Sequence, residues 1–163
     1  MIVIDADFAS VIAKAEIIEL VKQLFSGKHD LIITPKVYEE LEVPKEYGYT
    51  YPDEIFNNID VLTTESVEQE LYIDMLGSNQ ALGKGELESI AVCMNRSAIF
   101  ATLDEKAMRF AKTRSIHVLH LHTVLKMLLK TGLCSEKDVL DIIKKIEKTD
   151  KRTIKLKLVF AQA

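Results

Sequence analysis

Residues 97–112, SAIFATLDEKAMRFAK, pass within a few positions from an apolar run to a charged segment with helical spacing. The apolar part, 97–103, has the length and composition of a buried strand, and the segment 105–114 that follows has the spacing of an amphipathic helix. Asp104 lies between the two. A strand that leads directly into a helix is the repeating unit of α/β folds. The predicted fold therefore depends on whether this unit recurs along the chain.

The unit does recur. Further strands are predicted at the short apolar runs 1–5 (MIVID), 30–34 (DLIIT), 59–64 (IDVLTT) and 115–121 (SIHVLHL). Helices are predicted at 8–25, 36–42, 65–76, 86–95, 122–132 and 135–148, the last with Ser135 as its N-cap. Strands that alternate with helices predict an α/β fold, a three-layer α/β/α sandwich around a mostly parallel central sheet.

Two connecting segments lack a helix or strand pattern, and the C-terminal tail has a strand pattern of its own. Residues 43–54, VPKEYGYTYPDE, contain two prolines and a glycine and are predicted to form a loop. Residues 77–85, GSNQALGKG, predict a second break. Near the C-terminus, 153–160, TIKLKLVF, alternates as an edge strand would. We therefore expect one domain over residues 1–150 and a tail over residues 151–163 that offers an edge strand.

Composition is that of a globular protein. The 163 residues suffice for one domain with a sizeable core, and 48% are hydrophobic and 28% charged. No apolar run approaches the ~18 residues of a membrane span, and the start of the chain lacks a signal-peptide pattern. Cys93 and Cys134 stand alone, which favours reduced thiols and a cytoplasmic location.

The net charge of −4 argues against a protein that coats nucleic acid by bulk charge. It leaves room for a local basic patch, and lysines are concentrated between residues 144 and 157. This basic segment could be a solvated helix face or a phosphate-binding surface, and the sequence alone does not choose between them.

Four acids fall after predicted strands or in the first turns of helices: Asp5, Glu40, Glu86 and Asp104. In an open parallel sheet, the carboxyl ends of the strands and the helix starts beyond them form the crevice where ligands bind. Taken singly, an acid at a helix start can simply complement the helix dipole, typically by ~0.3–1 kcal/mol. Asp5 is different, because it directly follows a buried strand, where an unpaired charge is costly.

Helix projections choose among neighbouring acids. In 86–94, ELESIAVCM, Glu86 falls at the boundary of the apolar face, whereas Glu88 is predicted to point to water. In 36–41, KVYEEL, Glu40 lies nearer the apolar stripe and Glu39 lies nearly opposite it. Glu86 and Glu40 are therefore the better candidates, with Glu42 as an open alternative to Glu40.

The ordered set of four segments IVIDADFAS, ITPKVYEEL, LGKGELESIAVC and FATLDEKAMRFA resembles the PIN-domain family of metal-dependent nucleases. The resemblance covers residues 1 to about 130, and 115–132, SIHVLHLHTVLKMLLKTG, resembles the closing strand and helix of prokaryotic members. It implies that four acids form the catalytic set, in chain order Asp5, Glu40, Glu86 and Asp104. Thr102 takes the place of the family's supporting hydroxyl. Asp7 departs from the pattern, because many relatives carry a small hydroxyl or amide residue there.

The resemblance also implies the chemistry. Hard carboxylate oxygens suit Mg²⁺ or Mn²⁺, which can bridge a phosphodiester and activate a water molecule. Asp5, Glu86 and Asp104 would be direct ligands, and Glu40 would hold a second ion or orient the water. The expected activity is that of a metal-dependent endoribonuclease. RNA is the expected substrate, with Arg109 and Lys112 guiding its phosphates. Many prokaryotic members are toxins of toxin–antitoxin pairs, so the resemblance implies an antitoxin protein as a partner and a homodimer as the assembly. No association with a membrane is expected.

Three other interpretations are kept beside this one. The chain could be a non-catalytic PIN-fold binding module in an antitoxin or RNA-processing complex. Asp5 and Asp7 also fit the Asp-x-Asp of haloacid-dehalogenase-type phosphatases, but Ala9 stands where that family has Thr or Val, and no late Gly-Asp-x-x-x-Asp segment follows. His120 and His122 would share one face of a strand and could bind zinc, but they lack a third ligand at a recognisable spacing.

Overall fold

A computed structural model describes residues 1–78 and 81–161 of the chain, so Asn79, Gln80 and the last two residues of the tail lie outside the described residues. Its centre is a five-stranded, entirely parallel sheet with the order β3-β2-β1-β4-β5. The strands are β1 (Ile2–Ile4), β2 (Leu31–Ile33), β3 (Asp60–Val61), β4 (Ile99–Ala101) and β5 (Val118–Leu119). All five predicted strands are present, each shorter than its apolar run.

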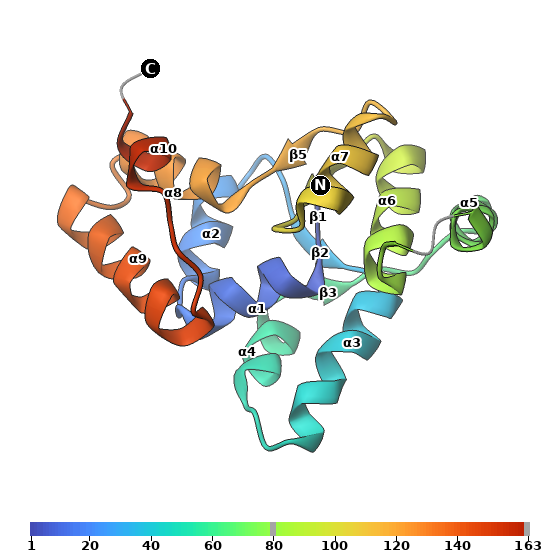
Figure 1. The fold of residues 1–163 in the computed structure, drawn as a ribbon, viewed down its shortest axis with the longest axis horizontal. Coiled ribbons are helices and arrows are strands. Elements are labelled where there is room, and N and C mark those ends of the chain that lie inside the picture. The colour runs from blue at the N-terminus through green and yellow to red at the C-terminus, as the bar shows by residue number, and fades with distance from the viewer. Residues whose placement is uncertain (79–80, 162–163) are drawn as a thin grey trace.

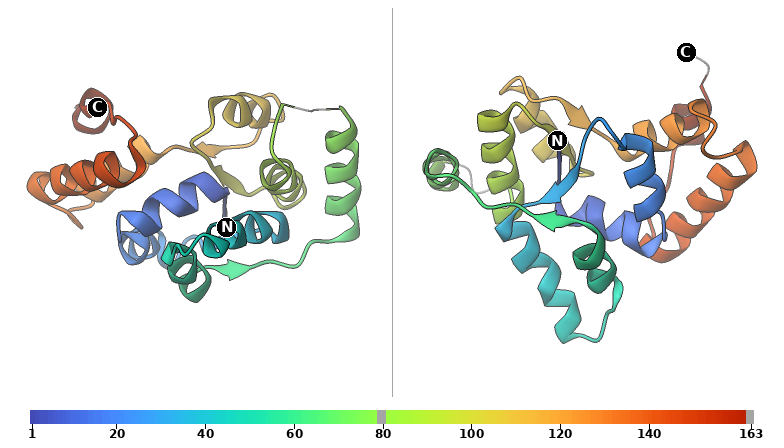
Figure 2. Two further views of the ribbon diagram at one scale, coloured as in Figure 1. Left: turned by 60° about the horizontal axis from the view of Figure 1, so that its bottom comes forward. Right: turned by 180° about the vertical axis from the view of Figure 1, so that it is seen from behind.

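Ten helices of the described chain cover the sheet: α1 (Ala6–Lys14), α2 (Ile18–Phe25), α3 (Pro35–Glu46), α4 (Tyr51–Asn58), α5 (Ser66–Ser78), α6 (Lys84–Arg96), α7 (Glu105–Lys112), α8 (Leu121–Lys130), α9 (Glu136–Asp150) and α10 (Leu156–Phe160). Figures 1 and 2 show α5, α6 and α7 at one end of the molecule and α8, α9 and α10 at the other. Ser135 caps α9 as predicted. None of these helices is both long and apolar enough to cross a membrane.

The strand residues alternate between two cores, as the pleat of a strand requires. Ile2 and Ile4 of β1 are fully buried in the core shared with α1–α4 and α8–α10. Val3, between them, is fully buried in the second core, with α5, α6 and α7. A sheet buried on both faces explains why its strands read as continuous apolar runs. The predicted three-layer α/β/α architecture is confirmed.

The strand order fixes where a ligand can bind. From β1 the chain moves to β2 and β3 on one side of the sheet, then crosses to β4 and β5 on the other. The order therefore reverses between β1 and β4, and in open parallel sheets the crevice beyond the carboxyl ends of the strands at this point is the usual ligand site. Asp5 directly follows β1, and Asp104 follows β4 by three residues.

The helix predicted over 8–25 is wrong as a single element. It is two helices, α1 and α2, because Glu16 adopts a left-handed conformation with φ +59°. Ala13, Ala15, Ile17 and Ile18 are all buried around the break, so the kink lets both helices reach the core. The apolar spacing runs through the kink and gives no sign of it.

The loop predicted over 43–54 is also largely wrong. α3 continues through Pro44 to Glu46, and α4 begins at Tyr51, which leaves only 47–50 outside a helix. Pro52 lies in the first turn of α4, where a missing backbone N–H costs nothing. The prolines therefore mark a helix end and a helix start on either side of a short turn.

The tail does not form the predicted edge strand. Residues Leu156–Phe160 form helix α10, which packs on α8. Ile154 and Val159 are buried in the first core, whereas Leu156 and Leu158 are about half exposed. Ile154 and Val159 are five positions apart and are buried on the same side, as expected when an extended segment precedes a short helix. The edge that was expected to support a homodimer is therefore absent from the described tail.

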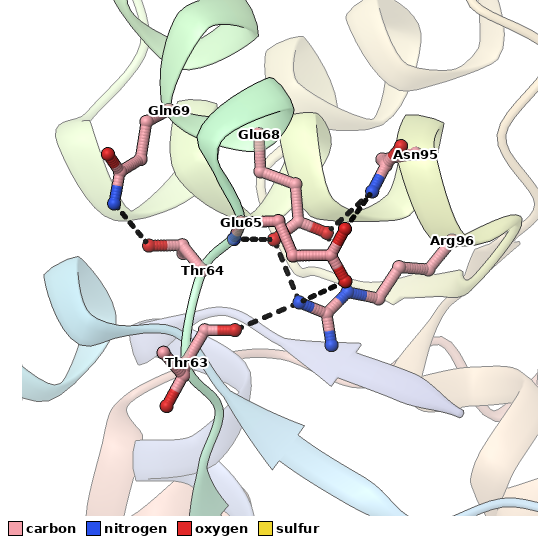
Figure 3. A network of polar contacts seen from close by, with 7 residues as sticks. All are labelled: Thr63, Thr64, Glu65, Glu68, Gln69, Asn95 and Arg96. Atoms are coloured by element: carbon pink, nitrogen blue, oxygen red, sulfur yellow. Dashed lines mark hydrogen bonds and ion pairs between the residues drawn. The ribbon is translucent and has the colours of Figure 1, made fainter.

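A buried ion pair fastens α5 to α6 (Figure 3). The carboxylate of Glu68 is fully buried and accepts hydrogen bonds from Arg96 Nε (2.6 Å) and Nη2 (2.8 Å). Asn95 Nδ2 (3.1 Å) and the backbone N–H of Glu65 (2.8 Å) complete its partners. Burial alone would raise the pKa of Glu68, but the hydrogen bonds from Arg96, Glu65 and Asn95 outweigh it and the pKa is lowered. This cluster orients α6, the helix that carries Glu86.

Candidate metal centre

Asp5 occupies the most enclosed position of the candidate site. Its backbone N–H donates to Ala101 O (3.0 Å), which extends the β1–β4 pairing and sets Asp5 beside Thr102. The side chain caps α1 by accepting from Phe8 N (2.7 Å), and the residue is 2% exposed. Burial raises the pKa of Asp5 to about 7, against the opposing effect of hydrogen bonds from Thr102 and Phe8. The carboxyl thus carries a charge that its surroundings poorly solvate.

Thr102 joins the two acids at the sheet edge. It is fully buried, its hydroxyl is hydrogen-bonded to Asp5, and its Oγ1 accepts from the backbone N–H of Asp104 (3.1 Å). Asp104 in turn caps α7, with Oδ1 accepting from Lys106 N (2.6 Å) and Ala107 N (2.8 Å). The predicted supporting role of Thr102 therefore has a physical form, a hydroxyl shared between Asp5 and the residue before α7.

Glu86 and Glu40 approach the same spot from two helices. Glu86 Oε2 accepts from Gly83 N (2.8 Å) at the start of α6, and Glu40 Oε1, from α3, accepts from Gly85 N (2.8 Å). A Cβ built on Gly83 would lie 3.7 Å from Glu86 Oε2 and 3.8 Å from Glu40 Oε1. The two carboxylates therefore flank the first turn of α6 on the side of the site.

These carboxylates interact as one negative cluster. Partial burial is the main cause that raises the pKa of Glu86, and repulsion from Asp104, Glu40 and Asp7 raises it further. Burial likewise raises the pKa of Glu40, with repulsion from Asp7 added. Asp7 also raises the pKa of Asp5. A divalent cation would relieve this repulsion, which is the physical reason for such a cluster to bind one.

The donor chemistry fits Mg²⁺ or Mn²⁺, because three of the four acids are fixed through one oxygen and keep another. Asp104 uses Oδ1, Glu86 uses Oε2 and Glu40 uses Oε1 for their backbone hydrogen bonds. Their second oxygens accept no hydrogen bond from the residues that the structure describes. Hard carboxylate oxygens of this kind are the preferred ligands of both ions.

The geometry is not that of a closed coordination shell. Among residues 1–78 and 81–161, no group of three or more Asp, Glu, His or Cys side chains is arranged to hold a metal ion. The carboxylates repel one another, and each accepts a hydrogen bond from a nearby backbone N–H. Both effects keep the carboxylates apart when no cation is bound. The four predicted ligands thus surround one edge of the sheet, and their roles as ligands remain predictions.

Asp7 and two predicted basic residues lie at the margins. Asp7 is exposed in the first turn of α1, and its Oδ2 lies 3.8 Å from Arg152 Nη2. Arg109 and Lys112 are exposed on α7. Sequence analysis included Arg152 only as part of the basic segment 144–157 and missed its approach to Asp7, because the two residues are 145 positions apart.

Glu88 was predicted to point to water, and that prediction is wrong. It is 6% exposed, and its Oε2 accepts from Lys36 N (2.7 Å) at the start of α3. The projection considered only the face of α6 toward the sheet, whereas α3 packs on another face of α6. Glu88 therefore joins α3 to α6 and helps to place Glu40.

A hollow of about 740 Å³ lies elsewhere, lined by residues such as Asp30, Leu31 and Asp60 at the amino ends of β2 and β3. It is at the opposite sheet edge from the acids and takes no part in the candidate site.

Comparison with known proteins adds one finding. A family model described as a PIN domain matches residues 1–159, nearly the whole chain. A search of curated proteins gave no match.

Proposed function

The chain belongs to the PIN-domain family, and from this premise we propose that it is a metal-dependent endoribonuclease that hydrolyses RNA phosphodiester bonds. PIN domains are generally nucleases, and the finer assignment is supported by one observation. Asp5, Glu86 and Asp104, together with Glu40, lie around the point where the strand order reverses. Three of the four keep an oxygen that no described residue binds.

In this proposal Asp5, Glu86 and Asp104 hold Mg²⁺ or Mn²⁺, which when bound supplies Lewis-acid activation of the phosphate and of water. Thr102 keeps Asp5 and the backbone of Asp104 in register through its shared hydroxyl. Backbone N–H groups at the starts of α1 and α7 donate to Oδ1 of Asp5 and Oδ1 of Asp104 and so fix the orientation of both carboxylates.

Glu40 is the group best placed to accept a proton or to orient water. Its Oε1 is anchored on Gly85 N (2.8 Å), and its Oε2 is left for a small molecule in the crevice. Partial burial and neighbouring acids raise the pKa of Glu40, and a carboxylate with a raised pKa is a better general base near neutral pH. Glu40 could alternatively hold a second ion, as the family resemblance allows.

The remaining parts of the proposal concern biology. We assign RNA as the substrate and place the protein in the cytoplasm, in keeping with two free, buried cysteines. A toxin role with an antitoxin partner is supported by the resemblance to prokaryotic PIN domains. A homodimer rests on that resemblance alone, since the tail is helical.

One observation favours a second candidate function, that of a non-catalytic PIN-fold binding module. No described group of acids is arranged as a closed metal site. A module without catalysis would bind its partner regardless of Mn²⁺ and leave RNA intact. The phosphatase alternative gains no comparable support.

The test is incubation of the protein with a mixed RNA pool and Mn²⁺. Wild type is compared with Asp5→Asn and with Asp60→Asn, a matched control that makes the same change on exposed β3. The proposal expects cleavage by wild type and control and a loss of about 100-fold or more in Asp5→Asn, the size typical for losing one group that stabilises charge in the transition state. Equal cleavage by all three would sink the assignment of Asp5, and no cleavage by wild type would favour the binding module.

A further inference from the structure

A second hollow lies beside the acidic site and has the opposite charge. It measures about 680 Å³ and is enclosed by α7, α8 and the chain segment 152–158. Four permanent cations line it, against one acid, Glu105; the cations are Arg109, Lys126, Arg152 and Lys155. In a chain with net charge −4, this concentration of positive charge is local. Such a concavity suits a phosphate-bearing ligand.

Most of these cations are not neutralised by the protein. Arg109, Lys126 and Lys155 have no carboxylate within 4.0 Å among the residues that the structure describes. By comparison, other basic side chains such as Arg96 and Lys36 are held by acids. Charges kept together without acidic partners repel one another, and an anion removes that repulsion.

Arg152 connects the basic hollow to the acidic site. Its Nη2 lies 3.8 Å from Asp7 Oδ2, and its Nε donates to Asp150 Oδ2 (3.2 Å). Asp150 is itself paired with Lys14 of α1 (3.3 Å), so the guanidinium is held against the helix that Asp5 caps. The remaining N–H groups of Arg152 have no partner in the described chain. Their planar fork is suited to the two oxygens of a phosphate.

The paired histidines supply another donor. His120 caps α8 and is stacked on His122, with the two Nδ1 atoms 2.8 Å apart. His120 Nδ1 accepts from His122 N (3.3 Å), and His122 Nε2 accepts from Lys155 N (3.2 Å). In the neutral pair, the one consistent assignment places a proton on Nδ1 of His122 and on Nε2 of His120. Burial, the largest cause, lowers the pKa of both rings, which favours this neutral pair with His120 Nε2–H as a donor.

We propose that this basic hollow binds the RNA strand next to the bond that is cut, with Arg152 on the phosphate nearest the carboxylates. The inference rests on the proposed nuclease function and deepens it. Its walls also contain apolar side chains such as Met108, Ile154 and Leu158, against which an unpaired base can pack. An acidic peptide would satisfy the charges, but continuity with the acidic site through Arg152 and Asp7 favours the substrate strand.

The test is binding of a fluorescein-labelled single-stranded RNA, measured by anisotropy in EDTA so that no cleavage occurs. Arg152→Ala is expected to weaken binding about tenfold, the loss of one charge-assisted hydrogen-bonded contact. Lys126→Ala and Lys155→Ala are expected to weaken it several-fold each. Each variant that loses one phosphate contact should also make the slope of log affinity against log salt concentration less steep by about 0.7. Lys22→Ala, which removes an exposed charge on α2 at the opposite edge, should bind as wild type.

Two further measurements keep the outcome decisive. Because Arg152 also contacts Asp7 and Asp150, Arg152→Lys is included, and its partial recovery of binding would support a charge contact over a folding defect. KM for RNA cleavage in Mn²⁺ should rise in Lys126→Ala with kcat little changed. Suppose that wild type cleaves RNA but that Arg152→Ala, Lys126→Ala and Lys155→Ala all bind RNA as wild type does. The RNA assignment of the hollow is then wrong and the proposed function stands. If wild type neither binds nor cleaves RNA, both fall.

Discussion

Glu40 Oε1 lies 2.8 Å from the backbone nitrogen of Gly85, although 45 positions separate the two residues. Only a glycine allows this approach, because a Cβ at position 85 would lie 2.8 Å from Glu40 Oε2 and 3.0 Å from Val37 Cγ2. The first turn of α6 thus places two acids at once, Glu86 by its own helix cap and Glu40 by a bond from its backbone.

Gly85→Ala is therefore expected to push the Glu40 carboxylate away while leaving the fold in place. The Glu40 carboxylate is the end of a flexible side chain and can move, but Val37 is fully buried and must also shift. Overpacking typically costs about 1–3 kcal/mol, and the helix preference of alanine over glycine offsets up to about 1 kcal/mol of it, so the free energy of unfolding should fall by no more than about 2 kcal/mol. RNA cleavage in Mn²⁺ should fall at least tenfold, as for a misplaced catalytic base.

The control for this variant is Gly77→Ala near the end of α5, where a Cβ meets nothing within 4 Å. It should leave cleavage unchanged. Urea unfolding and cleavage assays on both variants separate the two effects. Unchanged cleavage by Gly85→Ala would show that the position of Glu40 does not matter to the reaction.

Glu68→Gln is expected to be among the most destabilising single changes outside the apolar core. It leaves Arg96 without its buried counter-charge, and breaking a buried pair on one side typically costs about 3–5 kcal/mol. Since the Arg96 side chain is 25% exposed and water can reach it, a loss of about 2–3 kcal/mol in the free energy of unfolding is expected here. Urea denaturation measures it.

Glu65→Gln provides the matched comparison, because Glu65 faces the same guanidinium at 3.6 Å but its side chain is 63% exposed. A surface pair of this kind contributes less than about 1 kcal/mol. Equal losses in the two variants would show that burial of Glu68 has no energetic weight.

The sequence was informative wherever the structure is decided locally. The strands are short apolar runs because both sheet faces are covered, and Asp5 and Asp104 follow those runs directly. Parallel pairing then brings the two acids to one edge, as general rules for open sheets predict. The helix projection also placed Glu86 correctly at the boundary of the apolar face, since the residue is half-buried, while its role as a ligand stays a prediction.

Apart from the loop predicted over 43–54, the errors depended on contacts between distant segments. Glu88 is buried because Lys36 N, 52 positions away, donates to it. The left-handed conformation of Glu16 is stabilised by the burial of its neighbours in the core. The alternation in 153–160 is too short to distinguish a strand from one helical turn, and its packing on α8 decides between them. The basic segment 144–157 was noticed in the sequence, but the position of Arg152 beside Asp7 depends on packing between the two ends of the chain.

Stability without metal is expected to fall as pH rises from about 4 to about 7. The pKa of Asp5 is about 7 in the folded protein against 3.8 for a free side chain, so between these values the folded state holds a proton that the unfolded state has lost. The stabilisation is therefore complete below about pH 4 and gone above about pH 7, with an upper limit of about 4 kcal/mol. Glu40 and Glu86, whose pKa values are also raised, act in the same direction.

Urea unfolding in EDTA at pH 5 and pH 8 measures this effect, and Asp5→Asn isolates the part due to Asp5. The variant should lose less stability than wild type between the two pH values. With Mn²⁺ the dependence should reverse, because metal ligation requires the ionised carboxylate. Parallel profiles of wild type and variant in EDTA would contradict the raised pKa of Asp5.

Asp104 tests whether a helix cap can also be a metal ligand. Its Oδ1 alone makes both cap hydrogen bonds, to Lys106 N and Ala107 N, so the other oxygen is left for an ion. Asp104→Asn keeps a good N-cap and should hold the free energy of unfolding in EDTA within about 0.5 kcal/mol, whereas Asp104→Ala should lose about 1 kcal/mol. Both variants should lose the rise in melting temperature that Mn²⁺ gives wild type, because each lacks the ionised oxygen. Thermal unfolding with and without Mn²⁺ decides the matter: a full Mn²⁺ response in Asp104→Asn would leave Asp104 as a cap and nothing more.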